Sequence, residues 1–184
     1  MKNKVKVSLI LSVLAALTVT FGIGYRNVNR AYAETALNSV PEGEALSFND
    51  SVTIKVEDSE YMPQNWKSDQ INPNGQGDYR VIHAHLLFAN MGSSEETVDL
   101  SEFYMSTTGY SQGVSLEFLS SGDSTGTSGI NITIPVGGEA ESDLYYVIHS
   151  ISFTDAQWKS IEKEKFWISC SEYYPERQRL ELDL

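Results

Sequence analysis

The sequence predicts an all-β fold: an antiparallel β-sandwich with one short helix, preceded by an N-terminal apolar helix. Apolar and polar residues alternate with period two in several short segments, which is the pattern of strands with one buried face. Turn signals recur between these segments, and seven or eight short strands joined in this way are typical of a sandwich. A long uncharged run near the N-terminus follows neither pattern and predicts the preceding helix.

The first 33 residues are identified as a targeting segment by their charge and hydropathy. Residues 1–6 are basic and residues 7–25 carry no charge, so a helix over this run is about 28 Å long, close to the hydrocarbon thickness of a bilayer. A basic flank before such a run directs the N-terminus to the cytoplasm. The small residues Ala31 and Ala33 around Tyr32 are typical of a signal-peptidase site. The segment is therefore either a single-pass membrane anchor or a signal peptide cleaved after Ala33, and both alternatives place residues 34–184 outside the membrane.

Charge is divided unevenly along the chain. The 184 residues contain 25 acidic and 13 basic side chains, a formal net charge of −12. Residues 1–33 hold five of the basic side chains and none of the acidic ones, so residues 34–184 carry a net charge of −17. Such an acidic surface repels polyphosphates, which excludes nucleic acid as an expected partner. The single cysteine, Cys170, excludes a disulfide within the chain and a four-thiolate zinc site.

The strands are predicted after a polar tether over residues 34–47, so the sandwich domain is expected to cover residues 48–184. The first strand follows from Val52, Ile54 and Val56, which alternate with polar residues. The longest predicted strand covers residues 79–90, and its apolar face comprises Ile82, Ala84, Leu86 and Phe88. Shorter strands are predicted over residues 103–107, 114–119, 130–136, 144–148, 165–170 and 180–184.

One helix is predicted over residues 155–163. Thr154 is suited to the N-cap position, and Gln157 three residues later completes a capping box, which satisfies two backbone donors. Phe153 before the cap and Trp158 at the fourth helical position can form a hydrophobic staple. We expect this helix to lie across an open end of the sandwich.

Two connections are conspicuous. Residues 120–129 contain only serine, threonine, glycine and aspartate, which predicts a flexible hairpin loop. Residues 62–78 form a connection that is long for a compact domain, and such loops are often functional. Trp66, with Tyr61 and Tyr79 at the edges, supplies large contact area, so these three residues are predicted to bind a partner. The alternative is that Trp66 folds back and plugs one end of the sandwich.

His83 and His85 are the only candidate metal ligands. Their spacing places both imidazoles on the face of a strand opposite its apolar residues, a geometry that can chelate zinc or copper. Two ligands do not make a site, and His149 becomes a third only if the tertiary fold brings it close. The favoured interpretation is two structural histidines on a partly exposed sheet face. Cys170 shares the apolar parity of its strand and is expected to be a buried small hydrophobe.

No catalytic residue is predicted. The sequence contains no nucleophile elbow, phosphate-binding loop or metalloprotease helix. Carboxylates cluster at residues 57–60 and 95–99, but neither cluster has the spacing of a calcium loop. These groups are interpreted as solvated surface charge, and no cofactor is expected.

Two stretches are similar to a known group of proteins. The first runs from Tyr79-Arg80-Val81-Ile82 to Leu87-Phe88-Ala89-Asn90 and continues to Val98-Asp99-Leu100 and Phe103. The second is Ile134-Pro135-Val136-Gly137-Gly138-Glu139, leading into Leu144-Tyr145-Tyr146-Val147-Ile148. Over about residues 46–184 the chain resembles the extracytoplasmic immunoglobulin-like domains of unknown function on Gram-positive bacterial membranes and lipoproteins. The resemblance implies an immunoglobulin-like antiparallel β-sandwich outside the cell and implies no activity. The chain departs from the lipoprotein members because it lacks their acylated cysteine.

The sequence therefore favours a non-enzymatic, membrane-tethered or secreted extracytoplasmic module for binding or accessory roles. The expected partner is another envelope protein or a peptide, contacted through loops or an exposed strand edge. The alternative is a hydrolase or a metal-binding envelope protein whose site is not visible in the sequence.

Overall fold

The computed structural model describes residues 36–75, 77–119, 129–171 and 176–184. The predicted targeting segment and residues 120–128 of the predicted hairpin loop lie outside the described residues. Among the described residues, no helix has the length and apolar character needed to cross a membrane.

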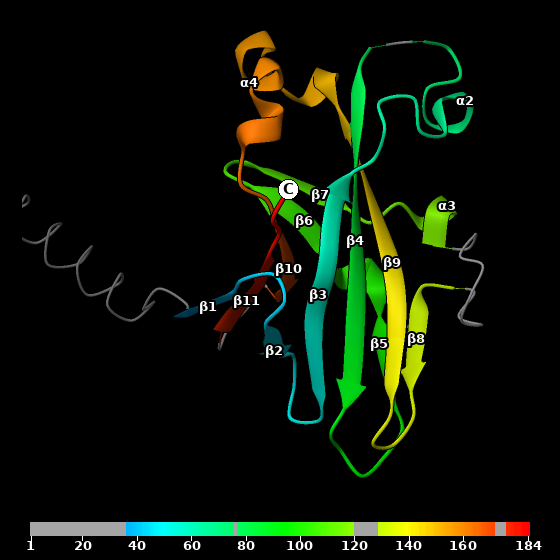
Figure 1. Ribbon diagram of the computed structural model, residues 1–184, viewed down its shortest axis with the longest axis vertical. Helices are drawn as coiled ribbons and strands as arrows, with labels where there is room; N and C mark the ends of the chain where they lie inside the picture. The colour runs from blue at the N-terminus through cyan, green and yellow to red at the C-terminus, as the bar shows by residue number, and fades with distance from the viewer. Residues whose placement is uncertain (1–35, 76, 120–128, 172–175) are drawn as a thin grey trace, which may run out of the picture. The chain divides into compact units, whose positions relative to one another are not determined.

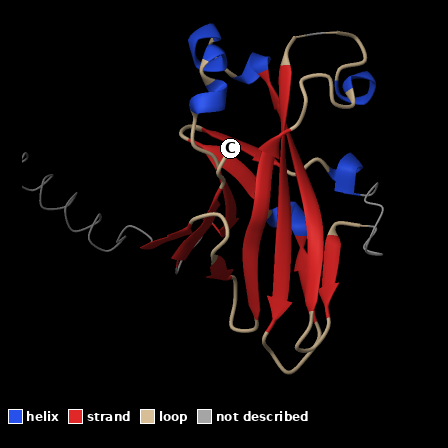
Figure 2. Ribbon diagram, viewed as in Figure 1, coloured by secondary structure: helices blue, strands red, loops and turns tan. Residues whose placement is uncertain are grey.

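The described chain is mainly β-structure with a few short helices (Figures 1 and 2). A four-stranded sheet has the order β2-β3-β4-β9, a five-stranded sheet the order β1-β11-β10-β6-β7, and a two-stranded sheet pairs β5 with β8. The four-stranded sheet comprises β2 (Ala45–Ser47), β3 (Val52–Tyr61), β4 (Tyr79–Asn90) and β9 (Glu139–His149). The five-stranded sheet comprises β1 (Ala36–Val40), β6 (Tyr104–Thr107), β7 (Tyr110–Gly113), β10 (Trp167–Ser171) and β11 (Glu176–Glu181). The small sheet comprises β5 (Glu96–Asp99) and β8 (Asn131–Ile134).

Strands β3, β4 and β9 are the long antiparallel strands of the four-stranded sheet, and β9 lies at its edge. The prediction for β4 is confirmed at both ends, since the strand covers Tyr79–Asn90. Its even-numbered residues from Ile82 to Phe88 are buried, as their alternation predicts. The register shifts between Val56 and Asp58, so β3 carries a bulge opposite His85 and Leu86 of β4.

One hydrophobic core is shared by all three sheets. Phe88 and Tyr146 of the four-stranded sheet are fully buried, as are Met105 of the five-stranded sheet and Ile132 of the small sheet. The Tyr146 hydroxyl donates to the carbonyl of Phe103 at 3.4 Å, which satisfies its polar group inside the core. The arrangement confirms the all-β prediction in its main features.

The helix prediction is confirmed at its N-terminus. Helix α4 covers Asp155–Lys159, and the capping box joins Thr154 and Gln157. The rings of Phe153 and Trp158 have centroids 6.0 Å apart, as expected of a hydrophobic staple. Beyond Ser160 the chain continues as the 3-10 helix η3 (Ile161–Lys163). Two further 3-10 helices are η1 (Leu100–Glu102) and η2 (Ser150–Ser152).

The strand predicted over residues 114–119 is wrong, because Leu116–Leu119 form the short helix α3. Alternation would place residues 116 and 118 on one face, yet Leu116 is 52% exposed whereas the adjacent Phe118 and Leu119 are both buried. The amide of Ser115 donates to the carbonyl of Tyr145 at 2.7 Å, so the chain before α3 is fixed against β9.

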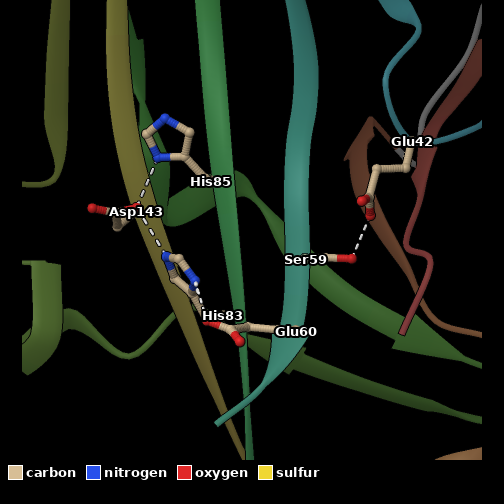
Figure 3. Close-up of polar contacts among 6 residues, drawn as sticks. All are labelled: Glu42, Ser59, Glu60, His83, His85 and Asp143. Carbon is tan, nitrogen blue, oxygen red and sulfur yellow. Dashed lines mark hydrogen bonds and ion pairs between the residues drawn. The ribbon is translucent and has the colours of Figure 1, made fainter.

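The range predicted as a polar tether contains strands β1 and β2. Leu46, the central residue of β2, is buried in the core. This one apolar side chain fixes an otherwise polar stretch to the domain. The Glu42 carboxylate accepts a hydrogen bond from the Ser59 hydroxyl of β3 (Figure 3). It also accepts one from the backbone amide of Asp183 at 3.0 Å. Glu42 thereby connects the turn between β1 and β2 to β3 and to the chain end.

Candidate functional site

The candidate site lies on the face of the four-stranded sheet that points away from the core, here named the outer face. Odd-numbered residues of β4 and β9 project from it, because successive side chains alternate across a strand. In the register of the sheet, His83 pairs with Glu60 of β3 and Tyr145 of β9. His85 pairs with Asp58 of β3 and Asp143 of β9.

A single carboxylate bridges the two histidines (Figure 3). Oδ1 of Asp143 lies 2.9 Å from Nε2 of His83 and 2.8 Å from Nδ1 of His85. His83 and His85 are thus on the same face, as the sequence predicts, but the group that unites them comes from the neighbouring strand.

Two more carboxylates flank the histidines. Oε1 of Glu60 lies 3.8 Å from Nδ1 of His83, and Oε2 of Glu141 lies 3.7 Å from Nε2 of His85. Acidic and imidazole side chains therefore alternate across three strands in the order Glu60, His83, Asp143, His85 and Glu141. We name this set the histidine–carboxylate chain.

The pKa of Asp143 reflects this position. Partial burial acts to raise it, but the hydrogen bonds from His85 and His83 and their charges outweigh burial, so the pKa of Asp143 lies below its ordinary value. The bridging group is consequently a carboxylate anion at neutral pH. Beside it, burial and the negative charges of Asp143 and Glu60 raise the pKa of the Tyr145 hydroxyl.

The geometry of the bridge differs from that of a metal centre. Asp143 lies between the two imidazoles (Figure 3). Within the described part of the chain, no group of three or more histidine, cysteine, aspartate or glutamate side chains is placed to hold a metal ion. His149, the possible third ligand, is the last residue of β9 and pairs with Tyr79 of β4. The residues of β9 that pair with His83 and His85 are Tyr145 and Asp143, so His149 is not beside either histidine in the sheet.

An aromatic cluster adjoins the histidine–carboxylate chain. Tyr145 stacks on His83 with ring centroids 4.8 Å apart and on Trp66 with centroids 4.9 Å apart. Phe118 of α3 meets the Trp66 ring edge-on at 5.0 Å. The Lys67 ammonium lies over both the Trp66 and Phe118 rings, at 4.8 and 4.6 Å from their centroids. We name Trp66, Phe118 and Tyr145 the aromatic cluster.

The connection over residues 62–78, here named the 62–78 loop, is fixed on the outer face by this cluster. Trp66 is half-buried and packs with a small group of apolar residues separate from the main core. The loop contains the short helix α2 (Ser68–Ile71), and Lys67 before it has a positive φ of 46°. A lysine in this left-handed conformation carries backbone strain, which the two ring contacts of its ammonium help to offset.

Trp66, Tyr61 and Tyr79 do not form one surface. Tyr79 is buried and its hydroxyl donates to the Trp66 carbonyl at 3.1 Å, so it supports the loop from beneath. The Tyr61 hydroxyl donates to the carbonyl of Ile161 at 3.3 Å near the main core, and burial raises the pKa of Tyr61 to about 12. Of the three, only Trp66 belongs to the aromatic cluster.

Cys170 and a groove beside β11 belong to neither the histidine–carboxylate chain nor the aromatic cluster. Cys170 is buried and desolvation raises the pKa of its thiol, in agreement with the predicted small hydrophobe. A groove of about 630 Å³ lies beside β1, β11 and the C-terminal residues, lined by both basic and acidic side chains such as Lys165, Arg179 and Glu181.

From the sequence, none of five residues of this face was assigned to a site, and one of them, Glu60, was interpreted as solvated surface charge; the five are Asp143, Tyr145, Glu60, Glu141 and Phe118. In β9 the outer-face residues alternate with buried ones, a signal that was present in the sequence. The pairing of these β9 residues with His83 and His85 depends on the register between β4 and β9. His83 and Asp143 are 60 residues apart in the sequence, and no local pattern predicts such a register.

Comparison with known proteins supports the fold and leaves the function open. Neither a protein-family model nor a curated protein matches this chain. A functionally unknown protein from Listeria monocytogenes has a similar structure, with a TM-score of 0.50 and 12% identity over 77% of this chain and 81% of that protein. An uncharacterised β-sandwich protein from Clostridium difficile has a TM-score of 0.48 and 14% identity over 82% and 97% of the two chains. The candidate lipoprotein YcdA from Bacillus subtilis has a TM-score of 0.45 and 15% identity over 73% of this chain. The matched region covers only 37% of the YcdA chain.

Proposed function

We propose that this protein is a non-enzymatic extracytoplasmic binding module with an immunoglobulin-like fold. The proposed location is supported by the basic start, the uncharged run over residues 7–25 and the acidic remainder of the sequence. The module is tethered by residues 7–25, or secreted if the chain is cleaved after Ala33. Protease added to intact spheroplasts is then expected to digest residues 34–184, and complete protection would contradict the location.

The proposed contact surface is the 62–78 loop. The observation that carries this proposal is the stack of Trp66 on Tyr145, which holds the loop on the outer face and outside the main core. Pro63, Gln64 and Asn65 are exposed immediately before this anchor. Exposed residues on a loop that is already held in place bind with a smaller loss of conformational entropy.

The proposed partner is another envelope protein or a peptide. Loops held on a rigid scaffold commonly carry binding, and this surface requires no catalytic group. The net charge of residues 34–184 disfavours polyanionic partners.

Affinity recovery from native membranes tests this function with matched variants. Gln64→Arg changes an exposed loop residue, whereas Val136→Arg changes a residue that is 56% exposed in the turn between β8 and β9, at the other end of the sheet (Figure 1). We expect a protein recovered with the wild-type chain to be lost with Gln64→Arg and retained with Val136→Arg. Equal recovery with both variants would exclude the loop as the contact surface.

A further inference from the structure

Polar groups without partners gather on one face of strands β10 and β11. Ile168 and Leu180 of these strands point into the core, so the odd-numbered residues project from the opposite face of the five-stranded sheet. Four of these residues each have a buried side-chain nitrogen or oxygen atom that makes no hydrogen bond within the described part of the chain. They are Trp167 (Nε1), Ser169 (Oγ), Arg177 (Nε) and Arg179 (Nε), here named the donor cluster.

The donor cluster is compact. Ser169 pairs with Arg179 in the register between β10 and β11, and Trp167 is two residues before Ser169 on the same face. The Arg179 guanidinium lies over the Trp167 ring, with Cζ 4.3 Å from the ring centroid. Ser169 is only 1% exposed, whereas Trp167 and Arg179 are half-buried and line the groove beside β11. The cluster therefore borders this groove.

The two arginines of the donor cluster have no carboxylate partner. The ion pairs within the described residues involve Lys55, Arg80 and the two histidines of β4, and neither arginine of the cluster forms one. Lys163 and Lys165, which also line the groove, form none either. Unpaired cations thus meet at this groove, although residues 34–184 carry a net charge of −17.

Carboxylates also line the groove, and they restrict what it can hold. Glu181 accepts a hydrogen bond from the Ser39 hydroxyl at 2.9 Å, and Glu162 pairs with Arg80 at 2.8 Å. Further carboxylates on the lining are Glu42, Glu164 and Asp183. Because both signs of charge are present, the groove repels a polyanion but can hold a single carboxylate beside the arginines.

A carboxylate has the chemistry that the donor cluster lacks. The planar guanidinium group of arginine binds a carboxylate through two parallel N–H donors. The two carboxylate oxygens have about four lone-pair sites, so they can also accept from the indole N–H or the serine hydroxyl. A buried donor without an acceptor is destabilising, and a ligand that supplies the acceptor removes this penalty.

The rest of the groove favours a peptide as the source of the carboxylate. Leu37 is 49% exposed and lines the groove together with Leu182 and Leu184. Apolar side chains of a peptide can contact these leucines, whereas a small inorganic anion cannot. The volume of about 630 Å³ is typical of sites that enclose a small ligand.

We propose that the donor cluster and the groove beside β11 form a binding site for a peptide carboxylate flanked by apolar residues. The carboxylate belongs to an acidic side chain or to the C-terminus of the peptide. Binding turns the Arg179 side chain so that its Nε–H and the indole N–H of Trp167 face the carboxylate. This site goes beyond the proposed function, because it does not include the 62–78 loop.

Titration calorimetry of the full-length chain with three blocked tripeptides tests the site. Acetyl-Leu-Glu-Leu-amide has a side-chain carboxylate, acetyl-Leu-Gln-Leu has a terminal carboxylate, and acetyl-Leu-Gln-Leu-amide has none. We expect at least one of the first two to bind with a Kd below about 1 mM, and the third to bind at least about tenfold more weakly. The tighter of the first two identifies the source of the carboxylate.

Matched variants assign the binding to the donor cluster. Arg179→Gln should weaken binding of the carboxylate peptide about tenfold, the effect of one lost charged hydrogen-bond partner. Lys159→Gln removes a positive charge from an exposed position of α4 that does not line the groove, and it should leave the affinity unchanged. Gln64→Arg in the 62–78 loop should also leave it unchanged, so this site and the proposed function can fail separately.

A second readout covers the case in which Arg179→Gln folds poorly. The indole N–H resonance of Trp167, assigned with Trp167→Phe, should shift in the wild-type chain as the carboxylate peptide saturates it. Equal affinity for all three peptides, no binding below about 1 mM, or an equal loss in Lys159→Gln would overturn the proposal. Inorganic phosphate should leave this resonance in place, and an equal shift at the same concentration would overturn the assignment to a peptide.

Discussion

Trp66 and Tyr145 stack with ring centroids 4.9 Å apart and planes inclined by 16°. Trp66 belongs to a loop and Tyr145 to the edge strand of the four-stranded sheet, so this contact fixes a long connection to the scaffold. The same tyrosine also stacks on His83, which joins the loop to the histidine–carboxylate chain.

Trp66→Ala is expected to lower the free energy of unfolding by about 2 kcal/mol. The ring is half-buried, so the loss should be smaller than the roughly 3–5 kcal/mol of a fully buried aromatic residue, with a contribution from the lost stacking. Urea unfolding measures the change, and Trp66→Phe should lose less because it keeps a stacking ring. A loss above about 4 kcal/mol would instead indicate a plug in the main core.

Asp143→Asn is expected to destabilise the protein at neutral pH, by about 1 kcal/mol for a partly exposed charged hydrogen-bond acceptor. The pKa of Asp143 is lowered in the folded state, so its ionic contribution is present above the ordinary value of 3.8 and is lost as the pH falls through the lowered value. The difference between wild type and variant should therefore shrink below about pH 4 in urea unfolding series.

Asp58→Asn is the matched control, because Asp58 occupies the register position on the opposite side of His85 and is exposed. We expect a change within about 0.5 kcal/mol at neutral pH. If Asp143→Asn costs no more than this control, the bridge contributes nothing to stability.

Phe118→Ala should cost about 3 kcal/mol, whereas Leu116→Ala should change stability by less than about 1 kcal/mol. Phe118 is 3% exposed beneath Trp66, and Leu116 is 52% exposed on the same short helix. Thermal and urea unfolding of the two variants compare them directly. Similar losses would favour the strand that alternation predicts over residues 114–119, in place of helix α3.

Zinc titration tests the two histidines. Since Asp143 lies between them, we expect calorimetry of the full-length chain to detect no zinc binding tighter than about 1 μM. A stoichiometric nanomolar site that disappears in His83→Ala would reverse this interpretation and make the outer face a metal centre.

Predictability from sequence differs between elements for physical reasons. Strand β4 could be predicted in full, because its residues from Ile82 to Asn90 alternate regularly between buried and partly exposed positions. Helix α4 could be predicted from Thr154 and Gln157, which act within one turn. Strand β5 was missed because Val98 is its only buried residue, which leaves too short a pattern to recognise.

The candidate site was predictable only in part. The shared face of His83 and His85 follows from strand geometry, whereas the bridge by Asp143 follows from the pairing of β4 with β9. Long-range register is set by packing of the whole sheet, so a local pattern cannot identify the partner. Trp66 could be singled out from the sequence because of its large aromatic side chain. Its stacking on Tyr145 could not be predicted, because it depends on the tertiary fold.

Site-specific photocrosslinking in intact cells tests the central claim most directly. A photoreactive residue replaces Gln64 in the loop or, as the matched control, Val136 in the turn between β8 and β9; both positions are exposed. If the 62–78 loop is the contact surface of an extracytoplasmic module, Gln64 should give a discrete adduct with another envelope protein, and Val136 should not. The same adduct from both positions, or none from Gln64 in a folded chain located outside the membrane, would contradict the account.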